Sequence, residues 1–269
     1  MKKQFLLSFI NFFIPIAFLF SQSTASKNVS TFTIEAPQLN TYKKIWMYLP
    51  ESYHKTNKSY PVFYMHDAQN LFDNETSYVG EWEIDEYLDQ INTNEVIVIG
   101  IEHGNEKRIE ELTPFPNKKY GGGNGDNYLL FIKNTLKPHI DITYRTKSKA
   151  KNTTIMGSSL GGLISYYAAL KYPNTFGKAG VFSPSFWFSD KIVDFTQNTN
   201  IETHTKLYFL IGSDEGKEVV SDMENVISLL IQKGLPKNQI NKQVIKGGKH
   251  NEAFWSSYFP NAHQWLILD

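Results

Sequence analysis

Uninterrupted runs of apolar residues recur along the chain and predict buried strands. The clearest runs cover residues 60–66, 95–101, 152–156 and 207–212. Further runs cover residues 44–50 and 179–183, and a short extended segment covers 243–245. Runs without polar alternation are typical of strands that are covered on both faces, as in a parallel sheet.

Helical patterns lie between these strands, at residues 83–90, 127–139, 160–171 and 219–233. The third pattern ends at Tyr172-Pro173 and the fourth at Gly234, which are residues that stop helices. Strand and helix therefore alternate for most of the length. This order predicts an α/β fold, with a mostly parallel central sheet and helices on both of its faces.

Residues 1–25 have the pattern of a secretory signal peptide. Two lysines precede an apolar run over residues 5–20, and small or polar residues follow. An uncleaved membrane anchor is the alternative, but the run is shorter than the roughly 20 residues that a span needs and contains a proline. We expect cleavage near residues 21–25, after Ser21 or Ala25, and export to the bacterial periplasm or the cell exterior.

Residues 26–269 are expected to form a single domain, because no linker or charge block divides them. The chain has no cysteine, so disulfides and a lipoprotein anchor are excluded. After signal cleavage we therefore expect no stable membrane anchor. The oligomeric state is left open by the sequence.

The overall charge is balanced, with 27 lysine and arginine residues and 27 aspartate and glutamate residues. Such a balance supplies no field that would recruit nucleic acid or anionic lipid. Aromatic residues make up 14% of the chain, which suits carbohydrate or aryl substrates, although most of these rings belong in the core. The glycine run at 121–125 lacks the spacing and the Lys-Ser/Thr ending of a phosphate loop, and no metal-ligand motif occurs.

The segment Gly157-Ser158-Ser159-Leu160-Gly161 lies between a predicted strand and a predicted helix. A serine hydroxyl becomes an effective nucleophile when a sharp turn exposes it beside a base and near N–H donors. The two glycines provide the space that such a turn needs, and the helix N-terminus adds free N–H groups and partial positive charge. The pattern predicts a serine hydrolase with Ser159 as its nucleophile.

The acid and the base should follow the serine in the chain, each in a loop after a strand. Asp214 and Glu215 directly follow the strand at 207–212, and either carboxylate could orient a histidine. Of the seven histidines, His250 lies just past an extended segment on a glycine-containing loop. His263 competes as the base, but its Trp-rich surroundings predict that it packs in the core.

The oxyanion of an ester intermediate needs two hydrogen-bond donors. One is predicted to be the backbone N–H of Leu160, directly after the nucleophile. The other should come from the loop after the strand that ends at His66, from the N–H of Asp67 or Ala68. Losing one such donor typically raises the barrier by about 3 kcal/mol.

Several segments together resemble the putative esterase family, which also contains carbohydrate esterase family one, the siderophore esterases and human esterase D. The most specific segment is residues 65–73, MHDAQNLFD, followed by Gly80-Glu81-Trp82. The similarity then continues through residues 108–114, 157–163, 182–187, 212–215 and 247–255. It covers nearly all of the chain after the predicted signal peptide.

This resemblance implies an α/β-hydrolase that cleaves carboxylic esters, such as acetyl and feruloyl groups on plant xylan or the ester linkages of enterobactin. It implies Ser159 as nucleophile, His250 as base and an acid within residues 212–215, where Glu215 matches better than Asp214. Ala68 departs from the family, whose members usually carry glycine there. An alanine N–H still donates, so we expect the oxyanion site to remain.

We therefore predict an exported serine esterase that forms an acyl-enzyme on Ser159 and acts on acetyl or feruloyl groups esterified to carbohydrate. Its partner would be a small-molecule or glycan-linked ester, and no cofactor or metal is expected. Trp187 and Trp82 are predicted to stack on a sugar or aryl ring, and Arg108 to line the pocket rim. The alternatives are a siderophore esterase, a non-catalytic carbohydrate-binding relative and an acyltransferase.

Overall fold

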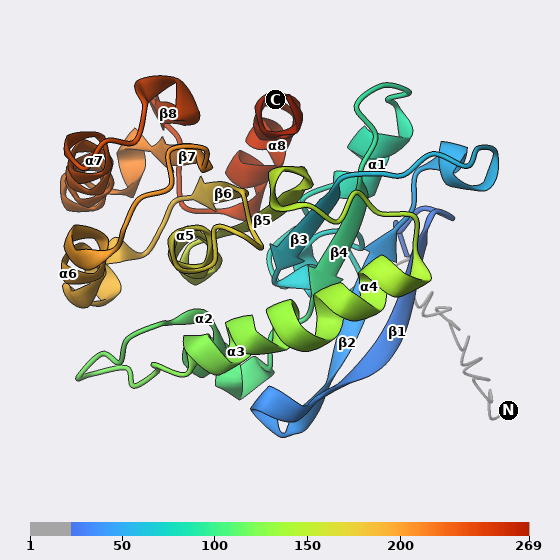
Figure 1. The fold of residues 1–269 in the computed structure, drawn as a ribbon, viewed down its shortest axis with the longest axis horizontal. Helices are drawn as coiled ribbons and strands as arrows, with labels where there is room; N and C mark the ends of the chain where they lie inside the picture. Colours follow the sequence, from blue (N-terminus) through green and yellow to red (C-terminus); the bar gives the residue numbers. More distant parts are fainter. Residues whose placement is uncertain (1–22, 269) are drawn as a thin grey trace, which may run out of the picture.

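The computed structural model of the protein describes residues 23–268, and within them eight strands form one sheet (Figure 1). The strand order is β1-β2-β4-β3-β5-β6-β7-β8. Strand β2 is antiparallel to both of its neighbours, β1 and β4, and all other neighbouring pairs are parallel. The bounds are β1 Val29–Ala36, β2 Thr41–Tyr48, β3 Val62–His66, β4 Ile97–Ile101, β5 Thr153–Ser158, β6 Lys178–Phe182, β7 Lys206–Gly212 and β8 Ile240–Ile245. The predicted α/β-hydrolase fold, with its mostly parallel sheet, is confirmed.

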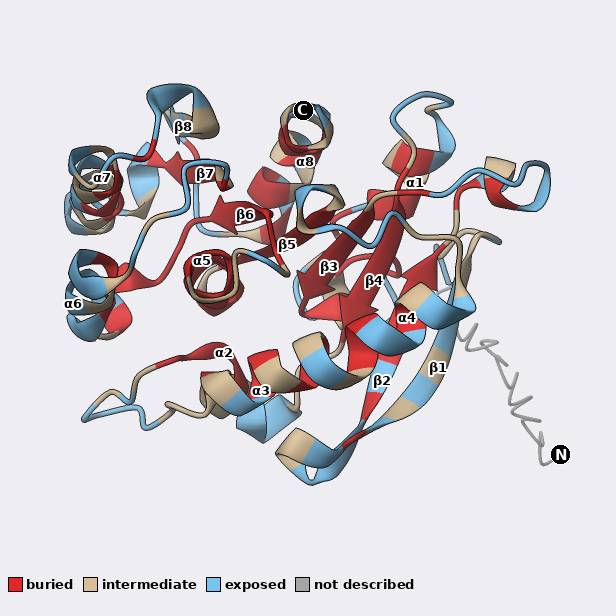
Figure 2. Cartoon of the chain, in the orientation of Figure 1, coloured by how far each residue is buried: buried red, intermediate tan, exposed pale blue. Residues whose placement is uncertain are grey.

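Helices cover both faces of this sheet, and two separate hydrophobic clusters result. The helices are α1 Ile84–Asp89, α2 Arg108–Leu112, α3 Gly125–Phe131, α4 Lys137–Thr143, α5 Leu160–Lys171, α6 Lys191–Asn198, α7 Lys217–Gln232 and α8 Glu252–Ile267. One cluster joins α3–α7 to one face of the sheet, and the other joins α1 and α8 to the opposite face. Figure 2 shows the buried central strands, the buried helix α5, and the exposed outer sides of α4, α6 and α7.

The predicted strands and helices are present, with shifts of a few residues at their ends. The helix expected at 127–139 is longer: α3 and α4 are joined by a π-helical turn, Ile132–Leu136, into one continuous segment ending at Thr143. Four elements were not predicted: β1, α2, α6 and α8. Strand β1 is an edge strand in which apolar and polar residues alternate over 32–36, unlike the uninterrupted apolar runs of the inner strands. Helix α8 contains Pro260 among many aromatic residues, so its helical pattern is unclear.

The predicted signal peptide lies almost wholly outside the described residues. The first described residues dock along α1, where the Ser26 N–H donates to the buried Asp85 carboxylate at 2.6 Å and the Asn28 amide donates to Asp89 at 2.7 Å. Within the described part of the chain, no helix combines the length and apolar character needed to span a bilayer.

Candidate active site

Ser159 occupies a strained turn between β5 and α5. Its φ is 57° and its ψ is −120°, a combination that non-glycine residues rarely adopt outside functional sites. Backbone hydrogen bonds hold this turn: the Ser159 N–H donates to the Phe182 carbonyl at 2.9 Å, and the Ser185 N–H donates to the Ser159 carbonyl at 3.1 Å. The turn therefore has the geometry expected of a nucleophile elbow.

Close backbone packing explains the small residues around this turn. A Cβ atom on Gly162 would lie 2.6 Å from the carbonyl oxygen of Phe182, and one on Gly157 would lie 3.0 Å from the backbone of Gly161. Real Cβ atoms do not approach a backbone oxygen that closely, so α5 can begin against β6 only without a side chain at position 162.

The hydroxyl of Ser159 and the ring of His250 line the same cavity, which has a volume of about 360 Å³. The Ser159 Oγ lies 3.2 Å from the Ser185 Oγ, and it makes no hydrogen bond to His250 among the described residues. Catalytic hydrogen bonds are often long before substrate binds and shorten in the substrate complex.

Glu215 lies beside His250, whereas Asp214 does not. The Glu215 Oε2 is 2.7 Å from the His250 Nδ1, and the Glu215 side chain is only 3% exposed. Asp214 is exposed, and its carboxylate accepts a hydrogen bond from the neighbouring Ser213 hydroxyl at 3.1 Å. Of the two candidate acids, Glu215 alone has the geometry to fix the tautomer of His250.

The loop that carries Glu215 and the loop that carries His250 contact each other through backbone atoms. Gly212 packs so closely against Gly248 that a Cβ atom would lie 2.1 Å from the Gly248 carbonyl oxygen. The Asp214 N–H donates to that same carbonyl at 3.1 Å. These contacts fix the distance between Glu215 and His250 through the main chain, which explains the glycines on both loops.

Two further side chains, Ser183 and Trp255, fix the position of the Glu215 carboxylate through hydrogen bonds. The Ser183 hydroxyl donates to Glu215 Oε1 at 2.6 Å, and the indole N–H of Trp255 donates to the Ser183 oxygen at 2.8 Å. The Gly212 N–H also donates to Glu215 Oε1, at 2.8 Å. The Trp255 ring then meets the edge of His250, with ring centroids 4.9 Å apart. Each of four side chains thus contacts the next in a ring: Trp255, Ser183, Glu215 and His250.

Both predicted oxyanion donors lie at the first residue of a helical turn. Leu160 opens α5, and Ala68 opens the short 3₁₀ helix Ala68–Asn70 after β3. The N–H groups of a first turn have no acceptor within their own helix and remain available for an anion. Asp67 precedes this turn with a left-handed φ of 57°. The use of these N–H groups as oxyanion donors remains a prediction.

Arg108, at the start of α2, binds Asp67 through two parallel hydrogen bonds. The Nε donates to Oδ1 at 2.7 Å and the Nη2 donates to Oδ2 at 2.8 Å. Burial acts to raise the pKa of Asp67, but the Arg108 guanidinium outweighs burial and the pKa is lowered. Arg108 lines the cavity, and its charge is matched by the Asp67 carboxylate. A role for Arg108 in binding substrate remains a prediction.

Two histidines in or beside the cavity are held neutral by burial. Burial lowers the pKa of His66 to about 4, and the His66 Nδ1 lies 2.8 Å from the buried hydroxyl of Tyr128. Burial also lowers the pKa of His103, which follows β4 and lines the cavity. His263 is packed in the core, as predicted, between Tyr87 and the Asn94 carbonyl.

The two predicted aromatic platforms have different surroundings. Trp82 lines the cavity but is 4% exposed, and it packs against the rings of Phe182 and Trp255 at 5.6 and 6.0 Å between centroids. Trp187 is 50% exposed and lies against Tyr120, 6.1 Å between ring centroids, and it does not line this cavity. Stacking of a substrate ring on either tryptophan remains a prediction.

Comparison with known proteins places the chain in a family. Residues 36–266 match the model of the esterase family described as "Putative esterase", and the chain belongs to this family. It is 30% identical over 237 residues to the uncharacterized protein YbbA of Bacillus subtilis, covering 83% of this chain and 92% of that protein. It is also 26% identical over 156 residues to an iron(III) enterobactin esterase of Dickeya dadantii, covering 52% of this chain and 35% of that protein.

A solved structure described as a ferulic acid esterase shares the fold, with a TM-score of 0.67. The two chains are 16% identical, and the match covers 89% of this chain and 98% of that one. This comparison shows the fold, and the family match identifies the protein as a carboxylic-ester hydrolase.

The sequence did not single out the residues that support the acid and the nucleophile. Ser183, Ser185 and Trp255 entered only as parts of segments that resemble the family, without roles of their own. Ser183 and Trp255 are 72 positions apart, so no local pattern indicates that they meet. One local signal was available: Ser183 is the last residue of a predicted strand and Ser185 lies two positions after it, where site residues collect.

Proposed function

We propose that this chain is an exported serine esterase that removes acyl groups, acetyl or feruloyl, from carbohydrate through an acyl-enzyme on Ser159. The observation that carries the proposal is the buried Glu215 carboxylate at 2.7 Å from His250, in the cavity that also contains Ser159. A buried carboxylate oriented on a histidine, in the same cavity as a strained serine, is an arrangement that serine hydrolases use for acyl transfer.

The proposed reaction has two steps. His250 takes the proton of Ser159 through Nε2 as the hydroxyl attacks the ester carbonyl, and Glu215 stabilises the imidazolium through Nδ1. The N–H groups of Leu160 and of the Asp67–Ala68 turn hold the oxyanion. His250 then protonates the leaving alcohol, and a water molecule releases the acid by the same route.

The carbohydrate assignment rests on charge as well as on similarity. Arg108 is paired with Asp67, and Glu252 also lines the cavity, so within residues 23–268 no unpaired arginine or lysine lines this cavity to face an anionic ligand. A ferric siderophore complex is strongly anionic and would favour such a cation. The similarity to the enterobactin esterase keeps a siderophore ester as the second candidate.

The test is hydrolysis of p-nitrophenyl acetate, methyl ferulate and enterobactin by the protein and by Ser159→Ala. We expect turnover of at least one of the first two esters by the wild type and only background hydrolysis by the variant. Turnover of enterobactin alone would move the substrate to the siderophore class. Absence of turnover on all three would reject the esterase proposal. Export is tested separately, by the N-terminal sequence of protein recovered from outside the cytoplasm.

A further inference from the structure

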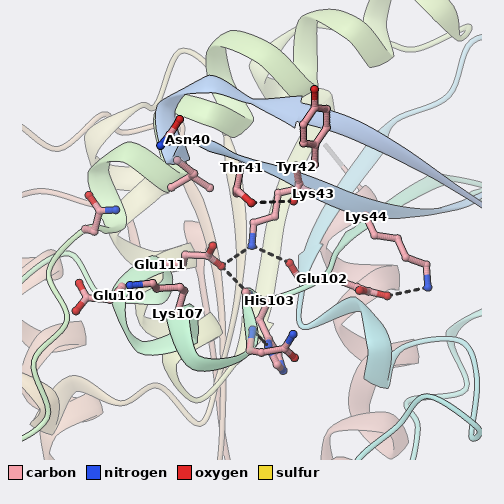
Figure 3. A pocket seen from close by; sticks show the side chains of 14 residues that line it. Asn40, Thr41, Tyr42, Lys43, Lys44, Glu102, His103, Lys107, Glu110 and Glu111 are labelled. Carbon is pink, nitrogen blue, oxygen red and sulfur yellow. Dashed lines mark hydrogen bonds and ion pairs between the residues drawn. The ribbon is translucent and has the colours of Figure 1, made fainter.

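A second cavity lies beside the candidate active site. It has a volume of about 620 Å³, against about 360 Å³ for the cavity that contains Ser159. Its walls come from the turn between β1 and β2 and from the segment that runs from the end of β4 into α2 (Figure 3). His103 lines both cavities, so the two spaces adjoin at this residue.

A buried ion pair forms a rigid wall of the second cavity. The Lys43 ammonium lies 2.6 Å from Glu111 Oε2, and both side chains are about 5% exposed or less. Lys43 also donates to the Glu102 carbonyl at 3.2 Å, and the Gly104 N–H donates to Glu111 Oε2 at 2.9 Å (Figure 3). A buried pair gains little net stability over apolar packing, so its value here is that it fixes the shape and polarity of the wall.

Other polar side chains around the cavity are unused. Among the described residues, the side chains of Asn40, Lys107 and Glu110 make no hydrogen bond or ion pair. Figure 3 shows Lys107 and Glu110 close together on one side of the cavity and Asn40 on the turn above them. They offer an amide, an ammonium and a carboxylate, which supply both donors and acceptors. A ligand with many hydroxyl groups can use both kinds at once.

The charged side chains that line the second cavity disfavour the binding of a charged ligand. Three lysines and three glutamates line the cavity, and two of each are already paired with one another, in Lys43–Glu111 and Lys44–Glu102. A phosphate, a catecholate or a polycation would meet equal numbers of both signs. An uncharged, polyhydroxylated group is not repelled by charges of either sign.

His103 is placed to hold a ligand at the junction. Its Nδ1 accepts a hydrogen bond from the Asn105 N–H at 2.9 Å, so a neutral ring carries its proton on Nε2. Burial lowers the pKa of His103, so the ring stays neutral at pH 7. The Nε2–H is thus a fixed donor between the two cavities.

We propose that the second cavity binds the carbohydrate part of an ester substrate, an uncharged sugar unit whose acyl group enters the Ser159 cavity past His103. The inference rests on the proposed esterase function and adds the location of the sugar. Asn40, Lys107 and Glu110 bind ring hydroxyls, and the Lys43–Glu111 wall sets their spacing.

The experiment compares two acetyl esters, acetylated xylotriose, which carries sugar units, and p-nitrophenyl acetate, which carries none. The variants are Glu110→Ala and Asn40→Gly; glycine keeps the left-handed φ of 51° at position 40. We expect the ratio of kcat/KM for the sugar ester to that for p-nitrophenyl acetate to fall about three- to tenfold in each variant, mostly through KM. Glu106→Ala, on the neighbouring exposed turn outside both cavities, is the matched control and should leave the ratio unchanged.

A ratio that stays within 1.5-fold of wild type in both variants would overturn the sugar site and leave the esterase function standing. Calorimetric titration of xylotriose into Ser159→Ala supplies a readout that does not depend on turnover. Binding that weakens at least threefold when Glu110→Ala is added supports the site. Binding that is undetectable, or equal with and without that change, overturns it.

Discussion

The sharpest prediction concerns the replacement of Glu215 by glutamine. Glu215 accepts from the Gly212 N–H and the Ser183 hydroxyl on Oε1, at 2.8 and 2.6 Å, and faces His250 Nδ1 with Oε2 at 2.7 Å. In Glu215→Gln the single amide oxygen must take the Oε1 position, because two donors point at it. The amide NH₂ then faces His250.

A hydrogen-bond donor at this position changes the tautomer of His250. The Nδ1 of His250 must accept from the amide, so the ring proton moves to Nε2, on the side that should receive the proton of Ser159. A histidine in that tautomer cannot act as the base, and the same error in a serine triad lowers kcat by about 10⁴-fold. We expect a loss of about 10³- to 10⁴-fold, equivalent to about 4–5.5 kcal/mol in the barrier.

The assay is the steady-state hydrolysis of p-nitrophenyl acetate at pH 8, with Asp214→Asn as the matched control. Asp214 is exposed and distant from the His250 ring contact, so we expect its variant to retain kcat within twofold. Thermal unfolding should show Glu215→Gln folded. A folded Glu215→Gln with more than a tenth of wild-type kcat would refute the reasoning, as would a large loss in Asp214→Asn.

Three further predictions follow from other contacts. Ser183→Ala removes a hydrogen bond to the Glu215 carboxylate and leaves the buried Trp255 indole N–H without its acceptor. We expect kcat to fall about tenfold or more, measured by steady-state kinetics, and the free energy of unfolding to fall by about 2–4 kcal/mol, measured by urea denaturation. Burial raises the pKa of Asp85 to about 8, so the folded state holds a proton that the unfolded chain has released, and stability should fall as pH rises from about 4 to 8. Asp85→Asn should reduce this loss of stability with pH. A wild-type melting temperature that is the same at pH 5 and pH 8 would contradict the prediction. Gly162→Ala should prevent soluble expression, because its Cβ would meet the carbonyl of β6 at 2.6 Å; a soluble, active variant would show that α5 can shift.

The parts of the fold that could be predicted are those with strong local patterns. The β5–α5 unit combines a continuous apolar run, a glycine-flanked serine and a proline stop, and α5 has the predicted bounds Leu160–Lys171. Strand β1 lies at the edge of the sheet and alternates apolar with polar residues over 32–36, so it lacks the uninterrupted apolar run that marks the inner strands. Helix α8 contains a proline and packs its aromatic side chains in the core, which hides its periodicity.

The candidate site could be predicted where each residue lies in the loop after a strand. Ser159, His250 and the Asp214-Glu215 pair all satisfy that rule. The choice between two adjacent carboxylates could not be made from position alone, because it depends on which side chain the 3₁₀ turn Ser213–Glu215 directs inward. The contact between Ser183 and Trp255 depends on the docking of α8, which is a property of the whole fold.

The position of α8 has a consequence for how the protein becomes active. This last helix supplies Trp255 and Glu252 to the candidate site, and its buried face completes the hydrophobic cluster that contains Phe182. A nascent or truncated chain that ends before residue 252 would hold Ser159, Glu215 and His250 but leave the aromatic face of the sheet uncovered. We therefore expect hydrolytic activity to require a docked α8, so that deletion of this helix would inactivate the protein without removing any residue of the predicted triad.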